Sequence, residues 1–137
     1  MSFAPETIHP DTWPAVHAVL APALAVSGES PVELIDQLLD GTAQLWVLRK
    51  GGDPIAAAVS ELVPSSPGLI VHGRLLAGGH MAEWLDDIID CITRHAAQAG
   101  AVGITIEGRP GWQRVLAAKG WKRSKVVMEL ALEKVDG

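Results

Sequence analysis

The sequence predicts an α/β fold in which a mixed, mostly antiparallel central sheet carries helices on both faces. Short alternating apolar runs typical of strands, such as residues 42–49 and 101–106, are interspersed with longer runs of helical period, such as residues 81–99. The early strands follow one another through short turns, which predicts antiparallel hairpins. The last part reads strand–helix–strand, which predicts a parallel crossover. The expected order is β-α-α-β-β-β-α-β-α-β.

Length and composition indicate a single domain over residues 1–137 that buries a core without disulfides or metal. With 48% hydrophobic and 20% charged residues, the chain does not have the composition of a disordered protein. Its apolar stretches are too short to cross a bilayer, and its first residues lack a signal-peptide pattern, so we expect no membrane association and a cytoplasmic protein. The single cysteine, Cys91, is expected to be a small buried core residue.

Two helices are predicted near the N-terminus, after a weakly marked strand around residues 5–8. Asp11 or Thr12 is expected to cap the first, and Pro14 is tolerated in its opening turn. The second begins at a capping box, Ser30 to Glu33, and ends at Gly41. The apolar residues expected to face the core are Trp13, Val16, Val19 and Leu20 in the first helix and Leu34, Ile35, Leu38 and Leu39 in the second.

The middle of the chain predicts a hairpin, a third strand and the longest helix. Residues 42–49 and 54–63 flank a Lys-Gly-Gly-Asp turn, and a Pro- and Gly-containing break precedes a strand over residues 69–76. A loop at residues 77–80 leads into a helix over 81–99, which ends at Gly100. Its apolar stripe comprises Met81, Trp84, Leu85, Ile88, Ile89, Ile92 and Ala96.

The C-terminal part reads as strand, tight turn, short helix, glycine and strand. The strand over residues 101–106 turns through residues 108–111, where Pro110 and Gly111 favour a tight turn. The short helix ends at Gly120, and a β-rich run begins at Trp121. The apolar side of the short helix comprises Trp112, Val115 and Leu116.

A net charge of −5 argues against a nucleic-acid partner, because it opposes long-range attraction to phosphates. Basic residues nevertheless gather near the C-terminus, with two tryptophans among them. A solvated basic face and a site for an acidic ligand such as a nucleotide phosphate are both open interpretations. These residues are Arg109, Arg114, Lys119, Lys122, Arg123 and Lys125, with Trp112 and Trp121 interleaved.

The element order and two motifs resemble the GNAT superfamily of N-acetyltransferases over nearly the whole chain. The motifs are the strand Gly41-Thr-Ala-Gln-Leu-Trp-Val47 and the turn Gly108-Arg-Pro-Gly-Trp-Gln-Arg-Val-Leu116. In detail they resemble small GNAT-like proteins of phage and prophage genomes. The resemblance implies a GNAT-like fold and two functions to choose between: acetyl transfer from acetyl-CoA to a primary amine of a small molecule or peptide, or a catalytically inactive structural or interaction protein of a phage particle or its assembly. The second alternative adds phage structural proteins as partners and the virion as a location, and family members often form homo-oligomers.

The resemblance also implies where acetyl-CoA would bind. In the family the fourth strand pairs with the pantetheine arm, and the loop into the next helix holds the pyrophosphate with backbone N–H groups. Glycine there lets the backbone approach phosphates, and the helix N-terminus adds partial positive charge. The glycines here are adjacent, not at the family spacing, and three acids follow: Glu83, Asp86 and Asp87. The expected cofactor-binding residues are Leu75, Leu76, Ala77, Gly78, Gly79, His80 and Met81.

Catalysis in the family generally uses a base for the amine and often a tyrosine for the leaving thiolate. The chain contains no tyrosine, so that role has no residue. The candidate bases are Glu61, His72 and Glu107, each predicted at or near a strand end facing the acceptor cleft; Glu107 with Arg109 is equally readable as an ion pair bracing the turn. The five histidines lack metal-ligand spacing, and His95 is expected to be a satisfied, partly buried side chain, so no metal is predicted.

Overall fold

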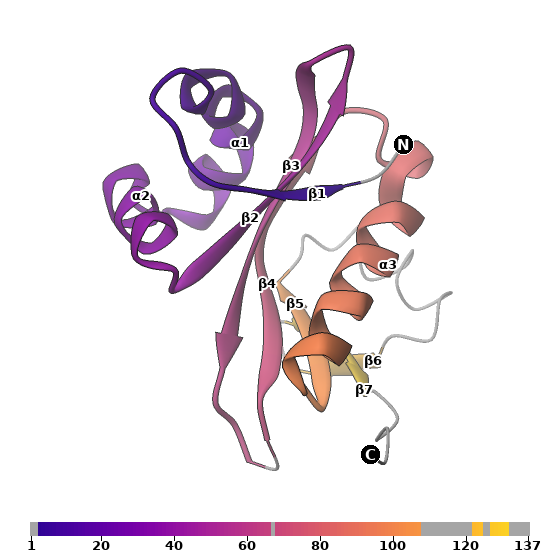
Figure 1. Cartoon of the computed structure of the whole chain (residues 1–137). Helices are drawn as coiled ribbons and strands as arrows, with labels where there is room; N and C mark the ends of the chain where they lie inside the picture. Colours follow the sequence, from indigo (N-terminus) through magenta and orange to yellow (C-terminus); the bar gives the residue numbers. More distant parts are fainter. Residues whose placement is uncertain (1–2, 67, 108–121, 125–126, 132–137) are drawn as a thin grey trace.

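The computed structural model describes residues 3–66, 68–107, 122–124 and 127–131, and these form one sheet with helices on both faces (Figure 1). The elements in chain order are β1 (Ala4–Glu6), α1 (Trp13–Ser27), α2 (Pro31–Asp40), β2 (Ala43–Lys50), β3 (Asp53–Val63), β4 (Ile70–Gly78), α3 (Met81–Ala99), β5 (Gly103–Glu107), β6 (Lys122–Ser124) and β7 (Val127–Ala131). The predicted α/β class and the order up to β5 are confirmed.

Within the described residues the sheet has seven strands, in the order β1-β2-β3-β4-β5-β7-β6. All neighbours are antiparallel except β4 and β5, which are parallel and are joined through α3. This is the predicted mixed sheet with one crossover. The predicted single C-terminal run is in fact two strands, since β6 pairs with β7. The predicted short helix after Gly108 lies outside the described residues.

Two cores lie on opposite faces of the sheet, as Figure 1 shows for the helices that cover them. One core packs α1 and α2 on β2, β3 and β4, around Leu20, Leu34 and Val59. The other packs α3 on the opposite face, around Trp46, Trp84 and Ile88. Burying such side chains contributes roughly 1.5–3 kcal/mol each, so packing on both faces stabilises the sheet.

For the three helices that the structure describes, the helix signals in the sequence are confirmed with two exceptions. Ser30 caps α2, since its Oγ accepts from the Glu33 N–H at 3.4 Å. At α1 the N-cap is Thr12, but its hydroxyl donates to the His9 carbonyl, and no side-chain capping bond forms there among the described residues. Leu39, predicted to face the core, is 65% exposed, because the apolar face of the short α2 is narrower than its run of leucines.

The strand at the sheet edge is anchored by an ion pair. Arg49 on β2 donates through Nε and Nη2 to the two carboxylate oxygens of Glu6, both at 2.8 Å. Such a two-point contact adds to the backbone pairing of this short edge strand and is specific in its geometry. The strand runs over Ala4–Glu6, not over residues 5–8 as the sequence predicts.

Among the described residues, no single helix is long and apolar enough to cross a membrane. α1 and α2 meet that test only together, across a bend of 117°, and both bury side chains against the sheet.

Candidate functional site

The parallel strands β4 and β5 part halfway along β4. Their last paired residues are Gly73 and Ile106, and β5 ends one residue later at Glu107. β4 runs on for five more residues to Gly78. Within the described part of the chain, residues 74–78 therefore pair with β3 on one side only, and their other edge is open toward the gap between the strands.

A β-bulge at Arg74 accounts for this parting. The β3–β4 register passes from Ser60 opposite Gly73 to Val59 opposite Leu75, so Arg74 is the extra residue on β4. A bulge bends its strand and increases the local twist. The bend begins where the pairing with β5 stops, and it carries the end of β4 away from β5.

The structure places the predicted cofactor-binding residues differently from the sequence reading. Leu75, Leu76, Ala77 and Gly78 belong to β4, which extends two residues beyond the predicted end of the strand, at Leu76. The connection to α3 is therefore only Gly79 and His80, not a loop over residues 77–80. The prediction failed here because Ala77 and Gly78 have weak strand preference, and their pairing with Ala57 and Ala56 decides the outcome.

Most of these residues line one cavity. It has a volume of about 400 Å³ and lies where the end of β4 meets the start of α3. The lining residues are Val19, Pro22, Ile55, Leu76, Ala77, Gly78, Gly79, Met81 and Trp84. The cavity therefore brings together five of the predicted cofactor-binding residues with side chains from α1 and β3.

The two adjacent glycines play different parts. Gly78 has φ +145°, and a Cβ there would lie 2.7 Å from the Ala56 Cβ and from the Ile55 carbonyl oxygen. Gly78 is thus required by the close approach of β3. An added Cβ at Gly79 meets no described atom within 4 Å, and Gly79 does not have a left-handed φ. Packing therefore does not require glycine at position 79, and its backbone is open to approach from outside.

The start of α3 has an unusual backbone. His80, the N-cap residue, is left-handed with φ +56°, and its side chain makes no capping bond among the described residues. The Trp84 indole donates to the Gly79 carbonyl at 2.7 Å and so anchors the connection between β4 and α3. The first N–H groups of a helix lack intrahelical partners and attract anions. The acids that follow are Glu83 and Asp86, which are exposed, and Asp87, which is half-buried.

Two of the three candidate bases are paired on adjacent strands. Glu61 on β3 lies opposite His72 on β4, and His72 lies opposite Thr105 on β5. The His72 Nδ1 and Thr105 Oγ1 are 2.6 Å apart, so one hydrogen bond holds the imidazole beside the last paired residues of β4 and β5. Glu107, the third candidate, is the last residue of β5 and pairs with Val127. Its side chain, like Arg109, lies outside the described residues.

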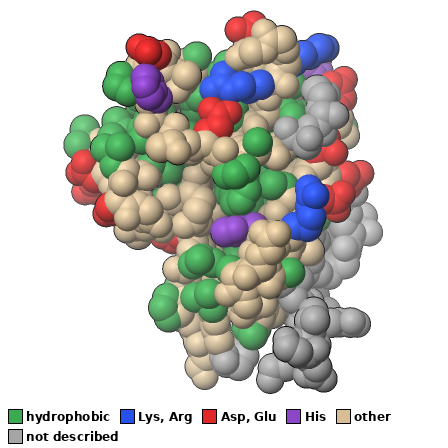
Figure 2. Space-filling model, viewed as in Figure 1, with side chains coloured by type: hydrophobic (Ala, Val, Ile, Leu, Met, Phe, Trp, Pro, Cys, Tyr) green, Lys and Arg blue, Asp and Glu red, His purple; other side chains and the backbone are tan. Residues whose placement is uncertain are grey.

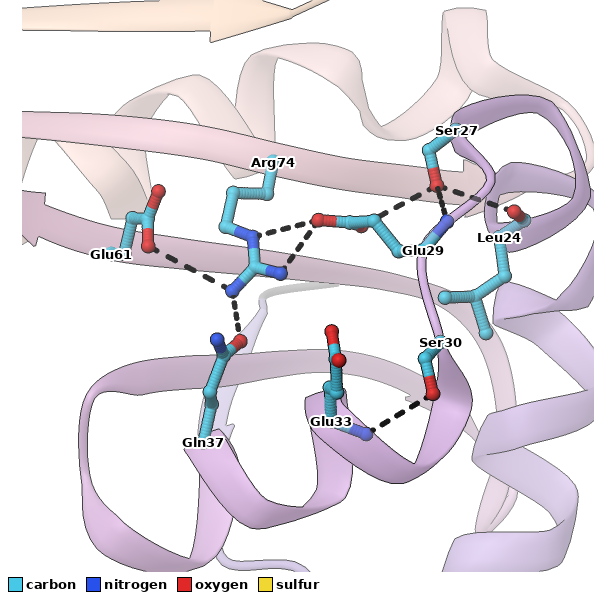
Figure 3. Close-up of polar contacts among 8 residues, drawn as sticks. All are labelled: Leu24, Ser27, Glu29, Ser30, Glu33, Gln37, Glu61 and Arg74. Atoms are coloured by element: carbon cyan, nitrogen blue, oxygen red, sulfur yellow. Dashed lines mark hydrogen bonds and ion pairs between the residues drawn. The ribbon is translucent and has the colours of Figure 1, made fainter.

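Arg74 connects the bulge to the helices, a role that the sequence reading missed. Its Nε and Nη2 donate to Glu29 Oε1 at 3.1 and 2.6 Å, and its Nη1 donates to Gln37 (Figure 3). Glu61 lies 3.8 Å from the same Nη1. Figure 3 shows these side chains converging from four places: the α1–α2 connection, α2, β3 and β4. An arginine inside a mainly apolar strand run was the available signal.

Arg74 is only 12% exposed, against 28% for Glu29 and 27% for Glu61. A charge as buried as this guanidinium needs paired acceptors, and it has two carboxylates and an amide. The cluster carries one positive and two negative charges, so its remaining field favours a cation nearby.

Two other notable side chains lie away from this region. Cys91 is buried, as predicted; its Sγ contacts the Phe3 carbonyl at 3.7 Å, and burial raises the pKa of its thiol, which the Arg94 charge opposes in part. His95 packs edge-on against Trp46, with ring centroids 5.0 Å apart. The prediction that His95 is satisfied is wrong for one atom, because Nε2 is buried and has no hydrogen-bond partner among the described residues. Burial lowers the pKa of His95.

Charges on the visible face are mixed. Figure 2 shows acidic and basic side chains interspersed over this face of the molecule. The predicted basic cluster near the C-terminus lies mainly outside the described residues. For Lys122 and Arg123 the structure describes the backbone only. Among the described residues, no group of three or more His, Cys, Asp and Glu side chains is arranged to hold a metal ion.

No protein-family model matches this sequence, and no curated protein matches it. Solved structures do. A ribosomal-protein-alanine N-acetyltransferase from Brucella melitensis biovar Abortus 2308 matches with a TM-score of 0.69 and 13% identity over 100% of both chains. A predicted acetyltransferase from Clostridium acetobutylicum, solved with acetyl-CoA, matches with a TM-score of 0.68 and 11% identity over 90% of this chain and 92% of that one.

A GNAT family acetyltransferase from Brucella melitensis in complex with acetyl-CoA matches with a TM-score of 0.66 and 17% identity, over 96% of this chain and 88% of that one. At such identities the likeness concerns the backbone. It extends over nearly the whole of each chain. This chain has the fold of the GNAT acetyltransferases.

Proposed function

We propose that this protein binds acetyl-CoA or a related acyl-CoA and transfers the acyl group to a primary amine. One observation carries the proposal: the open edge of β4 beyond Gly73 leads into the 400 Å³ cavity at the start of α3. An extended amide-containing arm adds to a free strand edge through backbone hydrogen bonds. A helix N-terminus beside an unobstructed glycine receives phosphates. Both features occur here in the order that an acyl-CoA presents them.

The residues that line the cavity fit this ligand in part. Gly79 leaves its backbone accessible, and Met81 and Trp84 supply apolar walls. Glu83 and Asp86 oppose a diphosphate, but both are exposed, and solvent and salt screen exposed charges. Several of the matching structures were solved with acetyl-CoA or CoA, among them an N-acetyltransferase from Thermoplasma acidophilum. This supports an acyl-CoA as the co-substrate.

The chain's own contribution to the reaction would be proton transfer and orientation. The acyl-CoA supplies an activated thioester. The amine nitrogen bonds to the acyl carbon, the carbon–sulfur bond breaks, the amine loses a proton to a base, and the thiolate takes a proton from water. His72 lies next to the point where β4 and β5 part and is oriented by Thr105, so we assign it as the base, with Glu61 facing it across the sheet. The chain has no tyrosine to protonate the thiolate, and we assign that step to water.

The acceptor is proposed to be an amine of a small molecule or peptide. The negative balance of the Glu29, Arg74 and Glu61 cluster favours a cationic acceptor near the bulge. An enzyme of this kind works in the cytoplasm, where acyl-CoA is available. A homodimer is compatible with the proposal and is not required by it.

Isothermal titration with acetyl-CoA, compared with CoA alone, tests the binding step. We expect a micromolar Kd for the native protein and loss of binding in Gly79→Val, because the branched side chain occupies the open space over the backbone. Ala97→Val, at an exposed position in the last turn of α3, is the matched control and should bind normally. No heat up to millimolar ligand from folded protein would contradict the proposal, as would normal binding by Gly79→Val.

A second candidate function is a GNAT-like protein without catalysis that acts as a structural or interaction module, as in a phage particle or its assembly. The lack of tyrosine favours it, and so do the exposed aliphatic residues Val26, Val32 and Leu39 on α1 and α2. Sedimentation velocity over a concentration series distinguishes the two. A module of this kind self-associates or binds a partner and does not bind acyl-CoA. A monomer that binds acetyl-CoA would exclude this second function.

A further inference from the structure

A second, smaller cavity lies on the other face of the sheet, between α3 and the strands. Its volume is about 40 Å³. α3 contributes Leu85, Ile88, Ile89 and Ile92, and the sheet contributes residues of β3, β4 and β5. Gly73 and Ile106, the last residues at which β4 and β5 pair, are both in its wall. The cavity therefore lies at the point where the two strands part.

The walls are apolar apart from one hydroxyl, and that hydroxyl is engaged. Ser60 accepts from the Trp46 indole Nε1 at 2.8 Å and donates to Gln44 Oε1 at 3.2 Å. A water molecule needs two to four polar partners to occupy a cavity, and apolar cavities stay dry. The described walls therefore lack the hydrogen-bond partners that a water molecule needs, whereas an aliphatic group needs none.

We propose that this cavity receives the acyl chain of the co-substrate, and that the protein prefers propionyl- and butyryl-CoA to acetyl-CoA. The inference rests on the proposed function, which puts the thioester at the parting of β4 and β5. Gly73 and Ile106 line the cavity at that point, so an acyl chain that starts there extends between apolar groups.

The size of the cavity sets the length of the chain. One water-sized group needs about 10–15 Å³ of such volume, so a cavity of about 40 Å³ holds about three groups. An acetyl methyl leaves most of it empty. The two further methylenes of a butyryl chain fill it, and an octanoyl chain is too long. The bonds made and broken are those of acyl transfer, since the added methylenes take no part.

The experiment is a titration of the native protein with acetyl-, propionyl-, butyryl- and octanoyl-CoA, with CoA alone as the reference. Each buried methylene is expected to lower Kd about fourfold, so butyryl-CoA should bind about fifteenfold more tightly than acetyl-CoA, with no further gain for octanoyl-CoA. Ile89→Phe fills the cavity from a half-buried position on α3 and should bring the butyryl-to-acetyl ratio of Kd close to one. Leu38→Phe, which packs on the opposite face of the sheet, should keep the ratio of the native protein.

Ile89→Ala enlarges the cavity and should move the preference to longer chains, which keeps the test valid if the phenylalanine variant does not fold. Equal affinity of the native protein for all acyl-CoAs would overturn the acyl cavity and leave the proposed function standing. Affinity that keeps rising to octanoyl-CoA would also overturn it, since the chain would then lie on another surface. Binding of no CoA species would remove both inferences.

Discussion

The Arg74 guanidinium donates to the Glu29 carboxylate, with 2.6 Å between Nη2 and Oε1, and so ties the bulge of β4 to the connection between α1 and α2. Forty-five positions separate these residues in the chain. The contact therefore connects β4, the strand that parts from β5, to the two helices that cover one face of the sheet. Stability and site geometry are therefore expected to depend on the same pair.

Arg74→Leu should lower the free energy of unfolding by about 2–4 kcal/mol, because it leaves two partly buried carboxylates without their cation. A double-mutant cycle with Glu29→Gln should give a coupling energy of about 1–2 kcal/mol. Urea unfolding measures both. Arg94→Gln, at an exposed position on α3, should change stability by less than about 0.5 kcal/mol. If the changes in unfolding free energy of the two single variants simply add in the double variant, the contact contributes nothing to stability.

Adjacent glycines should respond in opposite ways. Gly78→Ala should destabilise the fold by about 2–4 kcal/mol, since φ +145° is strained for alanine and the added Cβ would lie 2.7 Å from Ala56. Gly79→Ala should change unfolding by less than about 1 kcal/mol. Thermal and urea unfolding of the two variants give the comparison. Equal losses would mean that Gly79 also has a packing role.

Activity should depend on His72. His72→Gln should lower kcat about 10²–10⁴-fold at unchanged KM for acyl-CoA, as expected for removal of a general base. Thr105→Val should give a smaller loss, because it removes only the hydrogen bond that orients the ring. Thiol release from acyl-CoA in the presence of an amine measures the rates, with His9→Gln, at an exposed position, as control. Full activity of His72→Gln would transfer the role to a carboxylate.

The half-buried His95 should make stability dependent on pH. Burial lowers its pKa in the folded state, so the unfolded chain binds more protons in the acidic range. Its contribution is therefore complete above the ordinary histidine pKa of about 6.5 and is lost as pH falls through the lowered folded value. Urea unfolding at pH 7.5 and in steps below pH 6.5 should show a steeper loss for the native protein than for His95→Gln. Parallel curves would contradict this assignment.

Cys91 should be inert in the folded protein. It is buried, and burial raises the pKa of its thiol, so little thiolate forms and reagents cannot reach it. Its reaction with a disulfide reagent should be about tenfold or more slower in buffer than in denaturant. Rapid labelling of folded protein would show that α3 opens readily from the strands it covers.

The sequence by itself determined the fold class, the order of the elements up to β5 and the buried faces of α2 and α3, apart from Leu39. These follow from local causes: the apolar stripe of α3 has a clear helical period, and Ser30 caps α2 through a bond within its own turn. It failed where local preference is weak. Ala77 and Gly78 looked like a loop and are strand, because β3 supplies partners for them.

Only the tertiary structure decided what surrounds the site. The bulge at Arg74 arises from a one-residue slip between β3 and β4, and its charge partners come from segments far apart in the chain. The different requirements for Gly78 and Gly79 are a matter of what lies opposite each one. The cavity at the parting of β4 and β5 likewise exists through the packing of α3 on strands distant in sequence. Contacts between distant segments leave no periodic trace in a single chain, so the sequence predicted which elements form and the packing decided where they leave room.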